Sequence, residues 1–252
     1  MIIFVVRRNN KFVNGHKRGD NKFMLIDLKN IEKIYFRGES EIYALHQINL
    51  QIEKGEFVAI TGQSGSGKST LMNLIGCLDI PTSGEYYLNG ANIYKMREQQ
   101  LSKIRNQEIG FIFQGFNIIP ELDAQENVEL PLIYRGIKKS ERKKMSIHAL
   151  CQVGLEERLH HRPVQMSGGQ QQRVAVARAI AAKPPIILAD EPTGNLDSKS
   201  GAEVMEILKE LHRGGRTIIL ITHDEKIASQ AQRIVKIFDG KILKDQKKDE
   251  NI

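Results

Sequence analysis

The alternation of apolar and polar residues predicts a β-rich start to the chain from Met24. Residues 25–36, LIDLKNIEKIYF, alternate as a half-buried strand does, and residues 43–53, YALHQINLQIE, repeat the pattern. A turn at residues 54–56 precedes residues 57–60, FVAI, a continuous apolar run typical of a strand buried on both faces of a parallel sheet. The pattern therefore predicts an antiparallel β unit followed by the first strand of a parallel sheet.

The middle of the chain combines a helix, a hairpin and a long charged stretch. Residues 69–78, STLMNLIGCL, predict a helix that follows a glycine-rich loop, and residues 84–93, GEYYLNGANI, predict a hairpin. Residues 111–114, FIFQ, predict a short strand. From about residue 115 to 165 the sequence changes to charged segments with helical spacing, such as KKSERKKMSIHALCQVGL. We expect this region to form an inserted α-helical subdomain.

The last third of the chain returns to buried strands. Residues 186–191, IILADE, and residues 217–224, TIILITHD, are apolar runs that end in polar residues, and residues 201–212 between them predict a helix. Residues 233–244 predict a small hairpin. Together these patterns indicate an α/β fold. We expect a P-loop NTPase core with a mainly parallel sheet, an N-terminal antiparallel β subdomain and the inserted α-helical subdomain.

The composition fits one large folded domain without a membrane span. The chain has 252 residues, of which 40% are hydrophobic and 27% are charged, which is enough to bury a core. Cys77 and Cys151 are far apart and in no metal-ligand spacing, which favours a reduced, cytoplasmic setting. No apolar run approaches the roughly 20 residues of a membrane helix. We expect the chain to reach a membrane only through a partner.

The formal net charge of +7 is concentrated near the N-terminus. Residues 1–24 hold one acid, Asp20, and the basic residues Arg7, Arg8, Lys11, Lys17, Arg18 and Lys22. The rest of the chain is nearly balanced, so the charge does not indicate a nucleic-acid partner. We expect residues 1–23 to be a basic, mobile extension and residues 24–252 to be the folded domain, with Met24 as an alternative translation start.

A phosphate-binding loop follows the FVAI strand. The pattern G-x-x-x-x-G-K-[ST] is filled by Gly62, Gln63, Ser64, Gly65, Ser66, Gly67, Lys68 and Ser69. Glycines let the loop turn its N–H groups inward around phosphate oxygens, and the following helix adds its positive end. Lys68 supplies a cation for the β- and γ-phosphates, the Ser69 hydroxyl suits Mg²⁺, and we include Thr70 among the nucleotide-binding residues. A chance match is rare at this length.

Two further apolar runs end in groups that suit phosphate chemistry. Asp190 and Glu191 close IILADE, and because ligands collect at the carboxyl ends of parallel strands, these acids are expected beside the phosphate loop. Asp190 suits Mg²⁺, directly or through water, and Glu191 suits a general base. His223 closes the next run and could bond the γ-phosphate. Acids at strand ends are often only solvated, and a lone histidine is usually structural.

A second glycine pair opens a helix at residues 166–180, MSGGQQQRVAVARAI. Ser167, Gly168 and Gly169 would present unused N–H donors at the helix N-terminus, where anions bind. The plain alternative is a turn with an N-cap. Because the phosphate loop already serves one nucleotide, the second pair raises the question of which nucleotide it would meet.

The order of these motifs resembles the ATP-binding-cassette (ABC) ATPases over nearly the whole chain from Met24. The resemblance rests on the phosphate loop, Gln114, SGGQ, IILADE, NLD at residues 195–197 and His223, and SGGQ is the most specific of these. It is strongest with the lipoprotein-release, macrolide-export and antimicrobial-peptide-resistance branch, through MSGGQQQRVAVARA and PIILADEPTGNLDSKSG. Met166, where leucine is commoner, is a mild departure.

The resemblance implies roles for residues that the pattern alone leaves open. Two cassettes would pair head to tail around two ATP–Mg²⁺, so that Ser167, Gly168, Gly169 and Gln170 reach the γ-phosphate held by the other copy. Asp197 would lie at this interface, or simply cap the following helix. Gln114 would contact Mg²⁺ or water, although a glutamine at a strand end is more often structural. Tyr35 would stack on adenine, or pack in the sheet.

The function implied by the resemblance is that of an ATPase subunit of an ABC transporter complex. It would pair with itself or a related subunit, lie on the inner face of the cell membrane, and drive export or extraction by separate membrane-spanning permease subunits, because the chain stops after the cassette. Residues 116–136 are expected to dock that partner. One alternative is mechanical signalling to a wall hydrolase or division machine. A nucleic-acid-linked ABC ATPase or a small-molecule kinase fits the motifs less well.

Overall fold

A four-stranded antiparallel sheet forms the N-terminal part of the structure, a computed structural model that describes residues 24–38 and 40–248. Its strand order is β2-β1-β4-β5. The strands are β1 (Met24–Arg37), β2 (Ser40–Glu53), β4 (Ser83–Leu88) and β5 (Ala91–Asn92). Every neighbouring pair is antiparallel. The predicted antiparallel β unit and the predicted hairpin are confirmed, whereas the expected extension at residues 1–23 lies outside the described residues.

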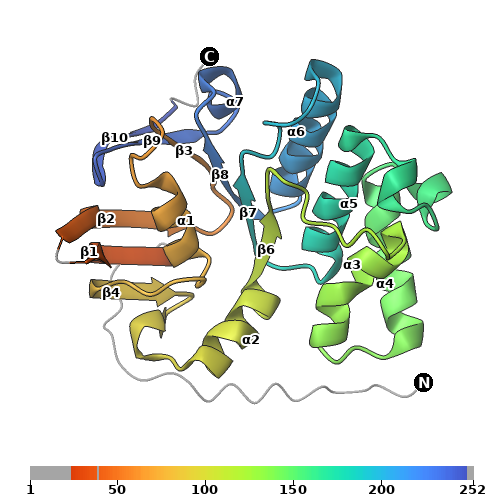
Figure 1. Cartoon of the computed structure of the whole chain (residues 1–252), viewed down its shortest axis with the longest axis horizontal. Coiled ribbons are helices and arrows are strands. Elements are labelled where there is room, and N and C mark those ends of the chain that lie inside the picture. The colour runs from red at the N-terminus through yellow and green to blue at the C-terminus, as the bar shows by residue number, and fades with distance from the viewer. Residues whose placement is uncertain (1–23, 39, 249–252) are drawn as a thin grey trace, which may run out of the picture.

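A six-stranded, mainly parallel sheet forms the core, in the order β10-β9-β3-β8-β7-β6 (Figure 1). The strands are β3 (Phe57–Thr61), β6 (Ile109–Ile112), β7 (Ile186–Asp190), β8 (Thr217–Thr222), β9 (Arg233–Phe238) and β10 (Lys241–Lys247). Strand β10 runs antiparallel to β9, and the other neighbouring pairs are parallel. All of β8 and all but the last residue of β3 and β7 are buried, as continuous apolar runs predict.

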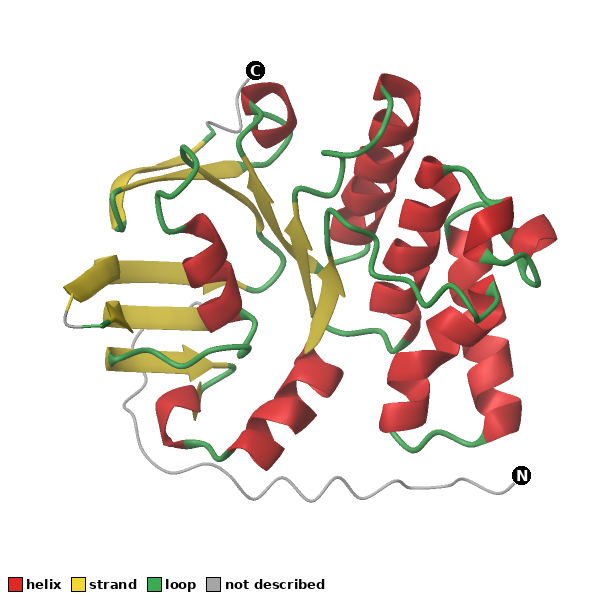
Figure 2. Cartoon of the chain, viewed as in Figure 1, coloured by secondary structure: helices red, strands yellow, loops and turns green. Residues whose placement is uncertain are grey.

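Helices cover the two faces of this central sheet (Figure 2). They are α1 (Lys68–Ile75), α2 (Glu98–Glu108), α3 (Ala124–Tyr134), α4 (Lys139–Gln152), α5 (Gly168–Ala181), α6 (Ser198–Arg213) and the short α7 (Glu225–Ala228). Alternate strand residues face opposite sides: Phe57 and Ala59 join the hydrophobic cluster with α3 to α6, and Val58 and Ile60 join the one with α1 and the antiparallel sheet. The predicted α/β fold is confirmed.

Helices α3 and α4 come between β6 and α5 in the sequence. In space they lie beside α5, at the right of Figure 1. The stretch between Ile112 and Ile186, which the structure describes throughout, contains no strand, as expected for a helical subdomain. Strand β6 ends at Ile112, so Gln114 lies in the loop two residues beyond it rather than at the strand end. Within the described residues, no helix has both the length and the apolar character that crossing a bilayer requires.

Candidate active site

The polar residues predicted at three strand ends share one cleft of about 970 Å³. Strands β3, β7 and β8 are parallel and in register, with Thr61 opposite Thr222 and Asp190 opposite Ile221, so their carboxyl ends meet at one edge. The predicted residues that line the cleft are Gly62, Gln63, Ser64, Gly65, Lys68, Ser69, Gln114, Asp190, Glu191 and His223. The sheet topology therefore assembles candidates that are far apart in the sequence.

The phosphate loop is closely packed beneath this cleft. A Cβ added at Gly62 would lie 2.3 Å from the Ile237 carbonyl oxygen, so only glycine fits there. Gly67, the N-cap of α1, has a φ of 101°, a conformation that favours glycine. The buried Lys68 donates from Nζ to the carbonyl oxygens of Gly62, at 2.8 Å, and Gln63, at 2.7 Å. The cation is thus held inside the loop that precedes it.

Four other residues predicted to bind the nucleotide lie outside the cleft. Ser66 is buried, and its backbone carbonyl accepts a hydrogen bond from the Gly240 N–H at 3.0 Å. Thr70 interacts with the hydroxyl of Tyr35, which places that ring beside the start of α1. The Tyr35 hydroxyl donates to Asp79 at 2.9 Å, and its ring lies 5.0 Å from the Lys33 ammonium. Ser66, Gly67, Thr70 and Tyr35 do not line the cleft itself.

Asp190 and Glu191 stand together at the end of β7 in different environments. Burial raises the pKa of Asp190, the nearby Glu191 charge raises it further, and Lys68 opposes both. Glu191 adopts a left-handed backbone with a φ of 44°, which is costly for a residue with a side chain. Its N–H donates to the Ile221 carbonyl on β8 at 2.9 Å, which holds that conformation.

Glu191 and His223 form a pair within the cleft. The carboxylate Oε1 of Glu191 accepts from the His223 backbone N–H at 3.1 Å and lies 2.6 Å from His223 Nδ1. An ionised carboxylate can only accept, so Nδ1 carries the hydrogen in this contact. The Glu191 side chain is 16% exposed and the imidazole 70% exposed. A carboxylate held in this way at the cleft wall is suited to take a proton from water.

The cleft offers oxygen ligands that fit Mg²⁺. The hydroxyl of Ser69, the carboxylate of Asp190 and the amide oxygen of Gln114 are hard donors, and all three residues line the cleft. No group of three His, Cys, Asp or Glu side chains within residues 24–38 and 40–248 could hold a metal ion. This donor set matches Mg²⁺, which is usually held by one or two side chains together with substrate phosphates.

Gln114 is connected to the loop that follows Glu191. Its backbone carbonyl accepts from Asn195 Nδ2 at 3.0 Å, and its own Nε2 lies 3.4 Å from Asn195 Oδ1. Gly194 allows this approach, because a Cβ there would lie 2.8 Å from Gln114 Nε2. In the sequence Asn195 stands out only as part of NLD, whereas the structure shows it as the partner of Gln114.

The SGGQ motif and Asp197 lie outside this cleft, where each begins a helix. Ser167 caps α5: its Oγ accepts from the Gln170 N–H at 3.3 Å, and Gln170 Oε1 accepts from the Ser167 N–H at 2.9 Å. Asp197 caps α6 by accepting from the Ser200 N–H at 3.0 Å and the Ser200 hydroxyl at 2.6 Å. The N-cap alternatives considered for both residues are therefore present in the structure.

The two caps are packed against each other. A Cβ added at Gly169 would lie 2.5 Å from the Ser200 hydroxyl oxygen, so the first turn of α5 touches the first turn of α6.

Part of the cleft wall was not predicted from the sequence. This part consists of Glu225, Lys236, Phe238 and Leu243, most of which belong to the β9–β10 hairpin. The exposure of Phe238 (42%) and Leu243 (61%) is visible only in the structure, so the hairpin pattern of the sequence did not single them out.

Comparisons with known proteins agree with this geometry. The ABC transporter family matches residues 45–194. The macrolide export ATP-binding/permease protein MacB of Hyphomonas neptunium is 53% identical over 88% of the chain, which spans 34% of MacB. YvrO of Bacillus subtilis, an uncharacterized ABC transporter ATP-binding protein, is 52% identical over 89% of the chain and 98% of its own length. Thus the chain spans about a third of the MacB relative and nearly all of YvrO.

A solved structure agrees with these matches. A dimeric structure of the ATP-binding cassette MJ0796 in a post-hydrolysis state, bound to ADP and Pi, superposes with a TM-score of 0.82 and is 49% identical, covering 88% of this chain and 98% of MJ0796. The family match, the sequence identity and the shared fold show that the chain belongs to the ABC transporter family and is an ATP-binding cassette with ATPase activity.

Proposed function

We propose that this chain is the ATPase subunit of an ABC export complex and that it works as a head-to-tail dimer around two ATP–Mg²⁺. The main observation in favour of a dimer is that the chain has two candidate anion-binding features, the phosphate loop and SGGQ, at separate places. The phosphate loop lines the cleft, whereas SGGQ does not. The N–H groups of Gly168 and Gly169 have no acceptor within the described residues. A second copy would bring a γ-phosphate to these donors, and the dimeric MJ0796 structures support such pairing.

In this proposal, the cleft residues divide the chemistry of hydrolysis between them. Lys68 would exchange its two loop carbonyls for phosphate oxygens, because its ammonium already points into the loop. Glu191 would accept the proton of the attacking water, and His223 would hold the carboxylate in place. Ser69, Asp190 and Gln114 would hold Mg²⁺, which neutralises phosphate charge when bound.

A trapped dimer tests this function directly. Glu191→Gln keeps the shape of the side chain but removes the base, so the variant should bind ATP, fail to hydrolyse it and elute as a dimer in size-exclusion chromatography with ATP–Mg²⁺. Lys68→Ala should lose both binding and dimerisation. If Glu191→Gln binds ATP but stays monomeric at saturating ATP–Mg²⁺, the sandwich is wrong.

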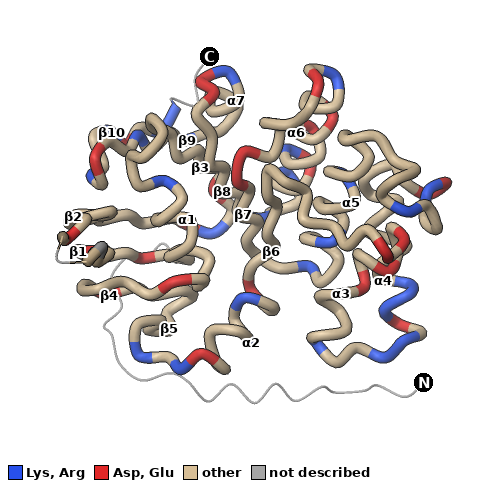
Figure 3. The backbone as a smooth tube through the Cα atoms, in the orientation of Figure 1, with Lys and Arg blue, Asp and Glu red and all other residues tan. Residues whose placement is uncertain are grey.

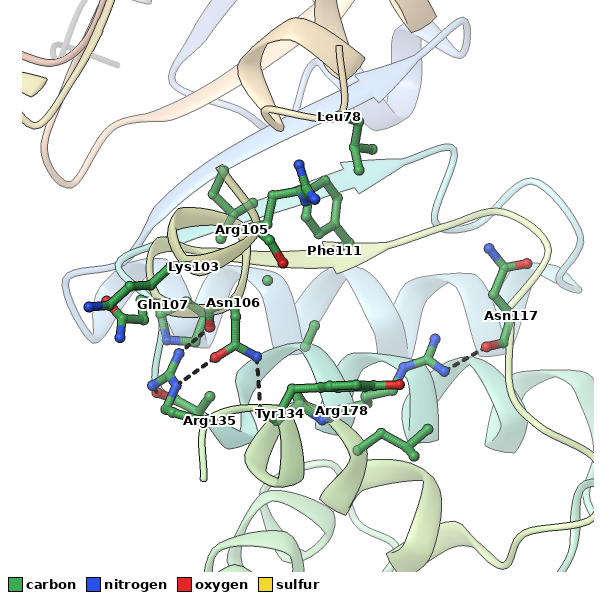
Figure 4. A pocket seen from close by; sticks show the side chains of 18 of the residues that line it. Leu78, Lys103, Arg105, Asn106, Gln107, Phe111, Asn117, Tyr134, Arg135 and Arg178 are labelled. Atoms are coloured by element: carbon green, nitrogen blue, oxygen red, sulfur yellow. Dashed lines mark hydrogen bonds between the residues drawn. The ribbon is translucent and has the colours of Figure 1, made fainter. Parts of the chain in front are cut away.

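A groove beside the catalytic cleft is the proposed docking site for the membrane permease. It has a volume of about 900 Å³ and lies between α2 and β6 on one side and α3 and α5 on the other. Figure 4 shows Tyr134 across the groove, with Phe111 and Leu78 opposite. Tyr134 is 83% exposed and Leu78 is 47% exposed, so the groove offers apolar surface to a partner.

Arg178 and Arg135, which line the groove, already donate hydrogen bonds to backbone carbonyls of the chain. Arg178 donates to the carbonyl of Phe116 and to that of Asn117, and Figure 4 marks the bond to Asn117. Arg135 donates to the Ala182 carbonyl, so both guanidiniums tie segments of the groove wall together. Burial lowers the pKa of both arginines. Basic residues also gather on the connection between α3 and α4 and at the start of α4 (Figure 3). The partner is therefore expected to insert an apolar element with polar ends.

The predicted docking segment, residues 116–136, forms only one wall of this groove. Phe116 does not line the groove; its ring lies instead near Gly168, where an added Cβ would be 3.6 Å from it. Tyr134→Asp should therefore abolish co-purification with the permease while ATP binding by the isolated chain stays unchanged. Ile119→Asp, outside the groove, is the matched control. Co-purification that survives Tyr134→Asp would place the docking site elsewhere.

Export or extraction from the inner face of the cell membrane is the direction we propose, because MacB carries macrolide export in its name. Mechanical signalling is the alternative, and the identity of the co-purifying membrane protein would decide between the two.

A further inference from the structure

Gln172 is a buried polar residue that belongs to neither the cleft nor the groove. It lies on α5, five residues after Ser167, and its side chain is 0% exposed. Its Nε2 donates to the Pro192 carbonyl at 2.7 Å and to the Phe113 carbonyl at 3.3 Å. One side-chain nitrogen therefore joins three segments of the chain.

The two acceptors are next to functional residues. Phe113 directly precedes Gln114 and lines the groove proposed for the permease. Pro192 directly follows Glu191. The donor itself comes from the helix that begins at SGGQ. Gln172 thus connects the loop of Gln114, the loop of Glu191 and the helix of Ser167.

The orientation of this amide is set by its acceptors. The NH₂ group has two hydrogens, one for each carbonyl, whereas Oε1 is buried and has no partner within the described residues. A flipped amide would turn its oxygen against two carbonyl oxygens, which is unfavourable. The two donated bonds therefore fix which end of the amide faces the Phe113 and Pro192 carbonyls.

The two loops need such an external support because their backbones are strained. Glu191 has a φ of 44°, and Phe116 and Asn117, just after Gln114, have φ values of 58° and 52°. Such conformations persist only when surrounding contacts hold them. Within the described residues, the two loops are hydrogen-bonded to each other directly only through Asn195, whose Nδ2 donates to the Gln114 carbonyl at 3.0 Å and whose Oδ1 lies 3.4 Å from Gln114 Nε2.

We propose that Gln172 is a positioning residue for ATP hydrolysis: it holds Gln114 and Glu191 in a fixed relation to each other and to the SGGQ helix. The proposal rests on the proposed roles of Gln114 and Glu191. It predicts that losing the two donated bonds impairs the chemical step rather than ATP binding, because both bonds go to the loops of Gln114 and Glu191 and neither goes to the phosphate loop.

The test replaces Gln172 with methionine, which has a similar length and cannot donate. A small misplacement of catalytic groups costs about 100-fold in rate, so kcat for ATP should fall by that order while KM stays within about threefold. Gln125→Met is the matched control: Gln125 is also buried, at 6% exposure, also has an unpaired Oε1, and its side chain donates to Glu129 on its own helix. The control should keep the wild-type kcat and KM.

A double-mutant cycle separates positioning from a general loss of stability. On a Gln114→Ala background, Gln172→Met should reduce kcat much less than it does in the wild type, because part of what it positions is already gone. Thermal unfolding of each variant shows that the assays are run on folded protein. The proposal is wrong if Gln172→Met keeps the wild-type kcat. It is also wrong if Gln172→Met reduces kcat by the same factor in the wild type and in the Gln114→Ala variant. A wild-type chain without ATPase activity would instead contradict the proposed function.

Discussion

The contact between the first turns of α5 and α6 predicts different outcomes for two neighbouring glycines. An alanine Cβ at Gly169 would lie 2.5 Å from Ser200 Oγ and 2.7 Å from Ser200 Cβ. At Gly168 the nearest atom, on the Phe116 ring, is 3.6 Å away, which is an ordinary contact. Gly169→Ala should therefore destabilise the fold, whereas Gly168→Ala should not.

The size of the effect follows from comparing the two variants. Both variants gain up to about 1 kcal/mol of stability because alanine favours a helix more than glycine does. This gain cancels when the stabilities of the two variants are compared. Overpacking at Gly169 costs about 1–3 kcal/mol, since Ser200 is held by its bond to Asp197 and cannot easily turn away. In a chain of this length each kcal/mol lowers Tm by about 2–4 °C, so Gly169→Ala should melt about 2–12 °C below Gly168→Ala.

Urea unfolding of the nucleotide-free chain, followed by circular dichroism, measures the difference in the free energy of unfolding between the two variants. Ser200→Gly removes both atoms nearest to the added Cβ, and on that background the two alanine variants should have similar midpoints. Equal midpoints of the two variants with Ser200 intact would refute the argument. A penalty that persists without the Ser200 side chain would show that another group is the obstacle.

Three further outcomes follow from burial and hydrogen bonding. Burial raises the pKa of the Cys77 thiol to about 11, so a thiol reagent near neutral pH should label only the exposed Cys151 until the chain is unfolded. Hydrogen bonds from Ser200 hold the pKa of Asp197 below its ordinary value. Asp197→Ala should therefore lower Tm at neutral pH, and the difference in Tm from the wild type should narrow as the pH falls from the ordinary aspartate pKa through the lowered one. Arg178→Met removes two bonds to carbonyls and should cost about 2–4 kcal/mol by urea unfolding.

The sequence predicted the cleft well because its features are local. Runs such as FVAI, IILA and IILI are apolar at every position, which is typical of strands buried on both faces, and this pattern identified β3, β7 and β8. Parallel strands place their carboxyl ends together, so residues just after these runs, such as Gly62, Asp190 and His223, can be grouped from the sequence alone. The fold and the composition of the cleft follow from that rule.

What the sequence did not predict depends on contacts between distant segments. Gln172 bonds to carbonyls 59 and 20 residues away, and nothing in QQQ distinguishes it from Gln170 or Gln171. Similarly, the groove joins Leu78 to residues of α2 and α5, so its position could not be read from residues 116–136 alone. Backbone carbonyls are the acceptors in the first case, and they leave no trace in side-chain patterns.

The two helix caps differ in what they have left to offer a second copy of the chain. The Asp197 carboxylate already accepts from two backbone N–H groups and the Ser200 hydroxyl, so three of its roughly four acceptor sites are used within its own helix, and it has no hydrogen to donate when ionised. Ser167 Oγ only accepts, at a long 3.3 Å, and its O–H has no acceptor within the described residues. With the N–H groups of Gly168 and Gly169, that hydroxyl makes three donors at the positive end of α5. Ser167 is therefore the cap equipped to bind a phosphate, and Asp197, fastened to it through Ser200 and Gly169, is better suited to fix its position.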